Sequence, residues 1–506
     1  MIWRTSPSTI HLPSDHLADL PDPDGLPDIV GGARAVADEI RRGRPILIYG
    51  DHDCDGLTGT AILVRAIREL GGEGVPFIPS RGPERGLRAQ VAVERAQVAG
   101  ARLVVTVDNG TASGHHIADL QGRGLEVVVT DHHTLADPLP ACPVINPIRP
   151  GTDRGLAVLS GAGTAWYLAA AVGRVLGRKW RSVDVLPLVA IGTVGDVVSV
   201  LGANRALIRA GLARMGSDAG LAGLCQVAGL EGALRASDLA FKICPAINAP
   251  ARLDQVELAR DLLLGGDVQQ ALDVWGLNEQ RRAIQATMMA EVDPADGPVQ
   301  AQYGWRPGLC GPVAGRLAER YGRASCIALT DERGSGSARG PGVLAILEAC
   351  RDLLTHYGGH SQAAGFGIDP VAVRAFRDRW VELVRPKGAV MVDEHVLAVE
   401  GELDLGRLDE LAQDLERREP FGACHPEPVY WGRFRVDEQG LSRSGEHRWA
   451  KLRQGRAAVR AWHFGSKDRL PLHPTLACRI SRSTWKGSEQ VQLHIVAVAD
   501  GETRIE

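Results

Sequence analysis

The stretch PILIYGDHDCDGLTGTAIL, residues 45–63, decides the fold of the first half of this chain. It opens with a short apolar run rich in β-branched residues, which is typical of a buried β-strand. Three aspartates then alternate with other residues, at Asp51, Asp53 and Asp55. The pattern predicts a helix from about Thr58 to Leu70, so the three carboxylates lie where a strand ends and a helix begins.

The same alternation of aspartates, followed by Gly56, also begins the calcium loop of an EF-hand. An EF-hand loop requires a bidentate glutamate at its twelfth position, where this chain has Ile62. An EF-hand loop also follows a helix, whereas residues 45–50 predict a strand. These two discrepancies exclude a calcium loop.

The composition is that of a globular protein, with 44% hydrophobic and 23% charged residues. A length of 506 residues suggests about three domains. The chain has no run of about 18 apolar residues, and its first residues lack the apolar core of a secretory signal, so no membrane association is expected. Nine cysteines without a C-x-x-C pair argue against a disulfide framework and a zinc finger, and they predict a cytoplasmic protein.

Strand and helix patterns alternate in the first half of the chain. Apolar strands are expected at 45–50, 74–79, 102–107 and 125–130, and their composition predicts a parallel sheet buried on both faces. A mostly helical region follows from Ala162 to Met289, and its last part predicts one long helix that links two domains.

A second, smaller α/β unit is expected from about Gln302, with a strand within residues 324–332. Glycine-rich turns are predicted in this unit at 334–340 and 357–367. After residue 389 the pattern changes to short alternating strands, which predict a small β-barrel.

Polar side chains follow three of the predicted parallel strands. Asp108 follows the strand at 102–107, and Asp131, His132 and His133 follow the strand at 125–130. Open α/β sheets form their sites at this carboxyl edge. A further acid, Asp196, lies in an apolar segment, where an unpaired carboxylate is costly.

Each of these residues has an ordinary explanation when taken alone, as a helix cap, a loop histidine or a partner of an arginine. Three strand ends with the same enrichment favour a shared metal site, because converging carboxylates repel one another unless cations lie among them. Oxygen and imidazole ligands without thiolate suit Mn²⁺ or Mg²⁺, and the histidine favours Mn²⁺.

Several segments resemble a known superfamily. GDHDCDG (50–56), TVDNG (106–110), TDHH (130–133) and the downstream Asp196 resemble, in order, the four phosphoesterase motifs of the DHH superfamily. YGGHSQAAGFG (357–367) resembles the glycine-rich motif of the companion DHHA1 domain. Three later segments resemble the RecJ branch of single-strand-specific exonucleases: CPAINAPARLDQVELARDLLL (244–264), WRPGLCGPVAGRLAERYGR (305–323) and EPFGACHPEPVYW (419–431).

The resemblance implies a DHH catalytic domain at 30–265, a linking helix at 266–300, a DHHA1 domain at 301–386 and an OB-fold nucleic-acid-binding domain at 390–506. It implies a 5′→3′ exonuclease that acts on single-stranded DNA in repair and recombination. The expected enzyme is a monomer, and its expected protein partner is a single-strand-binding protein or a helicase.

The resemblance also implies roles for the site residues. Asp53 and Asp108 hold one ion, and Asp108 is shared with the second ion, whose other ligands are Asp55, His132 and Asp196. The expected ions are two Mn²⁺, with Mg²⁺ as the alternative. His133 contacts the scissile phosphate or supports the metal ligands. Asp51 and Asp131 orient the metal ligands.

A grip on the terminal 5′-phosphate is implied for Ser337, Arg339, Arg81 and Arg252, with His360 reaching toward the active site. From the residues alone, a flexible hairpin turn is favoured over a phosphate site for the glycine-rich segment around Ser337.

The C-terminal part is locally basic, since residues 433–486 contain thirteen Lys or Arg and four Asp or Glu. Basic surfaces with exposed aromatic side chains bind single strands by neutralising phosphates and stacking bases. Among the aromatic residues of this segment, namely Phe434, Trp449, Trp462, Phe464 and Trp485, we expect Phe434 and Trp462 in the core.

Two alternatives stay open at this point. One is a DHH phosphodiesterase that acts on nano-RNA or cyclic dinucleotides, for which a basic C-terminal domain has no use. The other is a DNA-binding paralogue without catalytic metals, although every expected ligand position is filled. The chain contains no Gly-Lys dipeptide and therefore no Walker A loop, which argues against a nucleotide-driven motor.

Overall fold

The computed structural model describes residues 2–5, 15–80, 86–384, 396–485, 488–500 and 503–505. They form two compact units. The larger unit contains the described residues from 15 to 384. The smaller, C-terminal unit contains the described residues from 396 onward together with residues 2–5. The four domain boundaries predicted from the sequence stay predictions.

The larger unit contains a five-stranded sheet with the order β3-β2-β4-β5-β6. Every neighbouring pair in this sheet is parallel, which confirms the predicted parallel α/β architecture. The strands are β2 (Ile46–Gly50), β3 (Gly74–Phe77), β4 (Leu103–Val107), β5 (Glu126–Thr130) and β6 (Val144–Ile145).

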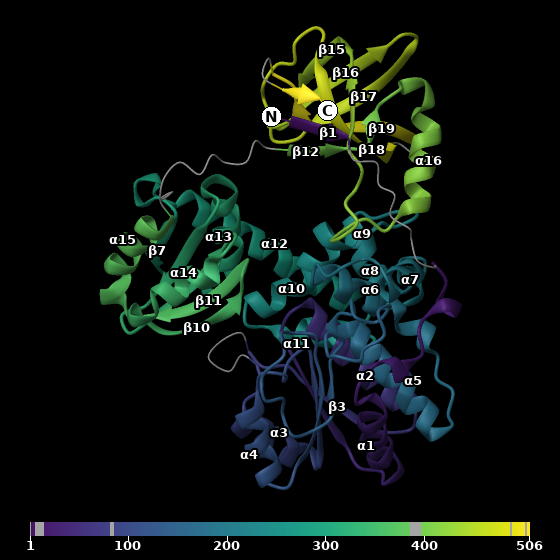
Figure 1. The fold of residues 1–506 in the computed structure, drawn as a ribbon, viewed down its shortest axis with the longest axis vertical. Helices are drawn as coiled ribbons and strands as arrows, with labels where there is room; N and C mark the ends of the chain where they lie inside the picture. Colours follow the sequence, from purple (N-terminus) through teal and green to yellow (C-terminus); the bar gives the residue numbers. More distant parts are fainter. Residues whose placement is uncertain are drawn as a thin grey trace. The chain divides into compact units, whose positions relative to one another are not determined.

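Helices cover both faces of this sheet (Figure 1). Ile46 and Ile48 of β2 pack into the core on one face, whereas Leu47 and Tyr49 pack into the core on the other. This alternation follows from the two-residue period of a strand and explains why the strands are apolar throughout. One face is covered by α1 (Ile29–Arg41), α2 (Cys54–Glu69) and α5 (Gly161–Leu176), and the other by α3 (Ala89–Ala99) and α4 (Gly114–Gly122).

Helix α2 begins at Cys54, four residues before the predicted start at Thr58. The reason is the side chain of Asp53, which caps the helix by accepting hydrogen bonds from the backbone N–H groups of Asp55 (3.1 Å) and Gly56 (3.2 Å). The aspartate-rich segment is therefore the first turn of the helix, and Asp55 lies within it.

The region after α5 is helical, as predicted. The expected long helix is confirmed as α12, which runs for 23 residues from Val268 to Ala290. Asp267 and Gln270 cap its start reciprocally, each side chain bonding the other residue's backbone N–H at 3.0 Å. The other elements include α6 (Leu186–Gly195), α7 (Ala203–Leu212), α8 (Ala219–Val227), a π-helix (Leu239–Ile243), α10 (Cys244–Arg252) and α11 (Val256–Leu263).

A second five-stranded sheet, with the order β10-β11-β9-β8-β7, follows α12. Its elements are β7 (Val299–Tyr303), α13 (Pro307–Tyr321), β8 (Ala324–Leu329), β9 (Gly334–Arg339), α14 (Val343–Ala349), β10 (Leu354–His360), β11 (Ala363–Ile368) and α15 (Val373–Val384).

The prediction of a glycine-rich turn at 334–340 is wrong, and the one at 357–367 holds only for Ser361 and Gln362. Residues 334–339 form strand β9, and most of the segment 357–367 forms the paired strands β10 and β11. The glycines serve packing: a Cβ atom added at Gly336 would lie 2.1 Å from the ring of Phe366 on the neighbouring strand. Side chains of the adjacent strand, such as Phe366, fill the space that these glycines leave.

The C-terminal unit contains an open, OB-like sheet of seven strands with the order β13-β14-β18-β19-β17-β16-β15. Phe434 is buried in its core, as predicted, whereas Trp462 is only partly buried, so its predicted core position is wrong. The strands are β13 (Gly401–Glu402), β14 (Tyr430–Arg433), β15 (Arg435–Leu441), β16 (Arg448–Gln454), β17 (Ala457–His463), β18 (Thr475–Trp485) and β19 (Ser488–Val498).

The N-terminal residues Ile2–Thr5 form strand β1, which completes a three-stranded sheet between β12 (Val396–Val399) and β20 (Arg504–Ile505). Trp3 is fully buried there against Val399 and Val429. The sequence analysis assigned no structure to β1, because four residues are too few to show a period. Within the described part of the chain, no helix is long and apolar enough to cross a membrane.

We expect Trp3→Ala to lower the free energy of unfolding of the C-terminal unit by about 3–5 kcal/mol, the usual cost of emptying a buried aromatic site. Thr5→Ala, at an exposed position of the same strand, should change it by less than about 0.5 kcal/mol. Urea denaturation followed by tryptophan fluorescence measures both. Equal effects of the two variants would show that β1 contributes no core.

Candidate metal centre

Asp108 is the central residue of the site at the carboxyl edge of the parallel sheet. It follows β4 with a φ of 61°, an uncommon backbone conformation for a residue with a side chain. Its carboxylate is buried, and neither oxygen has a hydrogen-bond partner among the described residues. Burial, together with the nearby charges of Asp53 and Asp55, raises the pKa of Asp108 well above its usual value. A buried, unsatisfied carboxylate of this kind calls for a cation.

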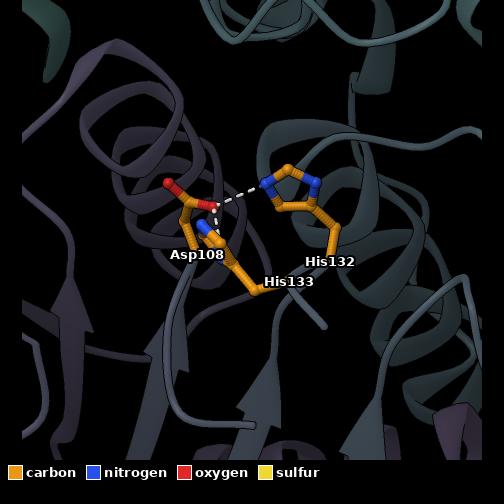
Figure 2. Close-up of side chains that lie close together, drawn as sticks. All are labelled: Asp108, His132 and His133. Carbon is orange, nitrogen blue, oxygen red and sulfur yellow. Dashed lines mark ion pairs between the residues drawn. The ribbon is translucent and has the colours of Figure 1, made fainter. Parts of the chain in front are cut away.

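His132 faces this carboxylate. Its Nε2 lies 3.0 Å from Oδ1 of Asp108, and 3.4 Å and 3.7 Å from carboxylate oxygens of Asp196 and Asp55 (Figure 2 shows Asp108 with the two histidines). Burial lowers the pKa of His132, which favours the neutral ring. Nε2 makes no hydrogen bond within the described residues, so it is available as a metal ligand.

Asp55 is held by the start of helix α5. Its two oxygens accept hydrogen bonds from the backbone N–H groups of Gly161 (2.6 Å) and Ala162 (2.9 Å). A helix N-terminus stabilises a carboxylate in this way, although burial still raises the pKa of Asp55. Asp196 ends helix α6, and burial together with the charge of Asp55 raises its pKa to about 8.

Two glycines that the sequence analysis missed make room for this arrangement. A Cβ atom at Gly161 would lie 2.9 Å from oxygens of both Asp55 and Asp108, and one at Gly192 would lie 2.7 Å from Asp55. The Gly-Ala-Gly run at 161–163, at the start of a predicted helix, is the feature that could have identified the first of them.

Asp51 and Asp53 form the other side of the centre, where ligand atoms of Asp51, Asp53 and Asp108 lie within 4.8 Å of one another. Oδ1 of Asp51 accepts a hydrogen bond from the backbone N–H of His52 (2.8 Å) and lies 2.7 Å from Nδ1 of that ring. The sequence analysis did not single out His52, which is buried and orients Asp51.

Asp131 differs from Asp108 because hydrogen-bond donors surround it. Its oxygens accept bonds from the backbone N–H groups of Thr111, His132 and His133, and Nδ1 of His133 lies 2.7 Å from Oδ1. Burial alone would raise the pKa of Asp131, but these bonds lower it to about 2. Burial alone would likewise lower the pKa of His133, and its bond with Asp131 raises that pKa to about 9. Asp131 therefore holds His133 in its protonated form.

Three groups of side chains in this centre could each hold a metal ion, and their ligand atoms lie within 4.8 Å in every group. Carboxylate oxygens with one or two imidazole nitrogens suit Mn²⁺ or Mg²⁺. The unpaired atoms of Asp108 and His132 and the space beside Gly161 fit such ions. The groups are Asp51, Asp53 and Asp108; Asp55, His132 and Asp196; and Asp108, His132 and His133.

Comparisons with known proteins agree with this geometry. Residues 45–193 match the DHH family, N-terminal domain, and residues 399–497 match the RecJ OB domain. The single-stranded-DNA-specific exonuclease RecJ of Thermus thermophilus is 34% identical over 93% of this chain and 71% of its own length. The chain belongs to the RecJ family. RecJ of Dickeya dadantii is also 34% identical, over 82% of this chain and 80% of its own length.

Solved RecJ structures share the fold as well. The crystal structure of Thermus thermophilus RecJ in complex with Mn²⁺ has a TM-score of 0.81 at 30% identity, covering 95% of this chain and 72% of the RecJ chain. A second structure, of exonuclease RecJ bound to manganese, has a TM-score of 0.62 at 33% identity, covering 71% and 94% of the two chains. Thermus thermophilus RecJ has also been solved in complex with Mg²⁺.

Three of the residues expected to grip phosphate in this RecJ-family chain, Arg252, Ser337 and Arg339, lie beside helix α13. Nη1 of Arg339 donates hydrogen bonds to Oγ of Ser337 (2.9 Å) and to the carbonyl of Ala338 (2.8 Å). Nη1 of Arg252 donates to the carbonyl of Gly308 (3.0 Å), in the first turn of α13. Arg339 and Ser337 approach Gly311, one turn further along.

His360 and Arg81 are the other two residues predicted to contact the substrate. The ring of His360, on β10, stacks on His133 with centroids 5.3 Å apart and an interplanar angle of 14°. This contact brings the second sheet to the metal centre. Arg81 lies outside the described residues.

In the metal-free protein, we expect the free energy of unfolding to fall as the pH rises from about 4 to about 8. The pKa of Asp196 rises from 3.8 to about 8 on folding, so the folded state binds more protons than the unfolded state in this interval. The raised pKa of His133, about 9, acts in the same direction. Denaturant titrations at several pH values with a chelator measure the slope.

Added Mn²⁺ should remove most of this pH dependence, because a bound cation stabilises the ionised carboxylates. Asp196→Asn should flatten the slope without any metal, whereas Asp119→Asn, at an exposed carboxylate, should leave it unchanged. A metal-free protein whose stability rises over this interval would contradict the assignment.

Proposed function

We propose that this chain hydrolyses phosphodiester bonds of single-stranded DNA from the 5′ end, using two divalent cations, Mn²⁺ or Mg²⁺. The observation that carries the proposal is the bare carboxylate of Asp108, which lies between two groups of ligands. Asp53 and Asp108 would hold one ion, with Asp51 beside them. Asp55, His132 and Asp196 would hold the other ion, which shares Asp108.

The ions would supply the chemistry common to two-metal nucleases, namely a lowered pKa of the attacking water and neutralisation of the charge on the phosphate. The side chains around them would position the substrate. His133, whose Nδ1 is held by Asp131, would present Nε2 to a non-bridging phosphate oxygen. His360 stacks on the His133 ring and limits its rotation.

The direction of degradation would come from Ser337, Arg339 and Arg252, with Arg81 as a further member of the same grip. A guanidinium and a hydroxyl that are already in contact form a ready site for a terminal phosphate. A strand whose 5′-phosphate sits there would present its first internal phosphodiester to the metal centre.

The outer face of the OB-like sheet supports a polymeric substrate. Trp449 and Trp462 are direct partners across β16 and β17, and the guanidinium of Arg460 lies 5.0 Å from the first ring centroid and 6.0 Å from the second. Phe464, 53% exposed, stacks on Trp462 at 6.0 Å. Partly exposed rings beside an arginine suit the bases and phosphates of a single strand, which a dinucleotide hydrolase would not need.

An enzyme that is specific for single strands cannot act on duplex DNA until the strands are separated. A single-strand-binding protein or a helicase that supplies such strands is therefore the partner class that fits, and we propose that the enzyme acts on DNA as a cytoplasmic monomer. The basic composition of residues 433–486 supports the DNA partner.

Asp108→Asn should lower the rate of single-strand hydrolysis by several orders of magnitude, because it removes a charged ligand common to both ions. Asparagine tolerates the positive φ of this position, so the fold should persist. Release of nucleotides from end-labelled DNA, with Mn²⁺ or Mg²⁺, measures the rate. Asp119→Asn is the control, and near-normal turnover of Asp108→Asn would refute the metal assignment.

Arg339→Ala should slow degradation of 5′-phosphorylated DNA about ten- to a hundredfold more than degradation of 5′-hydroxyl DNA. The expected difference is the usual contribution of a charge-assisted hydrogen bond. Arg333→Ala, at an exposed position before the same strand β9, should affect neither substrate. Equal slowing of both substrates by Arg339→Ala would count against the grip, and degradation from the 3′ end would overturn the proposed polarity.

A further inference from the structure

A groove of about 780 Å³ lies in the larger unit between α10, α12, α13 and the π-helix. Its walls include Phe241, Arg281, Arg282 and Arg316, and none of the residues of the metal centre lines it. We refer to the groove bordered by these four residues as the arginine groove. Neither the metal centre nor the phosphate grip accounts for it.

The positive charge of the arginine groove exceeds the negative charge of its walls, which carry three arginines and one carboxylate, that of Glu319. Arg281 donates hydrogen bonds at 3.0 Å to the side-chain oxygens of Asn278 and Gln285, which are neutral amides. Burial, together with the adjacent Arg282, lowers the pKa of Arg281. Across the described residues, no ion pair joins Arg281, Arg282 or Arg316 to a carboxylate. Guanidinium groups placed in this way suit a phosphate-bearing ligand.

Phe241 adds an aromatic surface to this charge. It lies in the π-helix, a rare geometry that often occurs at functional sites, and 77% of the side chain is exposed. A single exposed hydrophobic residue is ordinary, but an exposed ring beside several arginines is the combination that stacks a base and binds its phosphates.

Helix α13 connects the arginine groove to the phosphate grip. Gly308 in its first turn accepts the hydrogen bond of Arg252, and Gly311 packs against Arg339 and Ser337. Pro312, Gly315 and Arg316, in the following turns, line the groove. With a rise of 1.5 Å per residue, Gly308 and Arg316 are about 12 Å apart along the helix axis. The groove therefore lies within reach of later nucleotides of a strand whose 5′-phosphate sits in the grip.

We infer that the arginine groove is a second binding site for the single-stranded DNA substrate. Arg282 and Arg316 bind backbone phosphates, and Phe241 stacks on a base. The inference rests on the proposed function, since it concerns the path of the same substrate. An acidic peptide is the competing ligand for such a surface, and the shared helix α13 favours the DNA strand.

The test compares two variants with matched controls in the full-length protein. Arg282→Ala/Arg316→Ala removes two exposed charges of the groove, and Arg320→Ala/Arg333→Ala removes two exposed charges outside it. Phe241→Ala removes the ring, and Tyr303→Ala removes an aromatic side chain that is 60% exposed elsewhere in the unit. Fluorescence anisotropy with labelled oligo-dT and a chelator measures affinity at several salt concentrations without cleavage, and thermal melting verifies folding.

We expect Arg282→Ala/Arg316→Ala to reduce the slope of log affinity against log salt by about 1.4, because each phosphate neutralised on a single strand contributes about 0.7. Phe241→Ala should weaken binding about five- to a hundredfold, the usual effect of losing one stacked base. Both control variants should bind like the wild type.

Unchanged affinity and an unchanged salt slope in both groove variants would overturn the inference and leave an acidic peptide as the candidate ligand. This result is distinguishable from failure of the proposed function, which hydrolysis of single strands by the wild type tests separately. If the wild type degrades single strands and the groove variants bind DNA like the wild type, only the inference about the groove is refuted. Groove variants that lose affinity support the site whatever the hydrolysis rate of the wild type.

Discussion

The repulsion among buried carboxylates at the end of the parallel sheet is the constraint on which the rest of the structure depends. Burial, together with the charges of Asp53 and Asp55, raises the pKa values of Asp108 and Asp196, and Asp108 has no hydrogen-bond donor to relieve its charge. Only a cation can satisfy all of them as carboxylates. The fold holds these side chains together because their backbones belong to buried strands and helices that cannot move apart.

The roles of the individual acids follow from how many donors surround each of them. Asp131 receives three backbone N–H groups and an imidazole, so it stays ionised and positions His133. Asp55 receives two backbone N–H groups from α5 and turns toward the centre. Asp108 receives none, so its oxygens remain for a metal. Chemically identical side chains thereby acquire different functions through environment alone.

Helix α13 contacts the phosphate grip and lines the arginine groove, the two surfaces that are proposed to bind the strand. Its first turns carry the contacts of Arg252, Ser337 and Arg339, and its later turns form a wall of the arginine groove. The stacked rings of His133 and His360 join the two sheets of the larger unit beside the metal centre. The proposed 5′ polarity and the proposed second DNA site thus depend on one helix, whose glycines allow the arginines to approach closely.

The sequence by itself determined the parallel α/β architecture, the long helix α12 and the identity of the acids at the strand ends. These features have local causes: the period of apolar residues shows a buried strand, and the carboxyl ends of parallel strands meet at one edge. The RecJ-like segments extended this to the OB-like unit. For this reason Asp53, Asp108 and His132 could be chosen before any coordinates were known.

Tertiary structure alone decided the features that depend on residues distant in the chain. The glycines of β9 and β11 predict turns locally, but Phe366 fills the space beside Gly336 and makes these segments strands. Strand β1 exists only because β12 and β20, about 400 residues or more along the chain, flank it. Tertiary structure also explains why the oxygens of Asp108 have no hydrogen-bond donor. The donors around each acid come from elements distant in the chain, and no local sequence pattern predicts which elements these are.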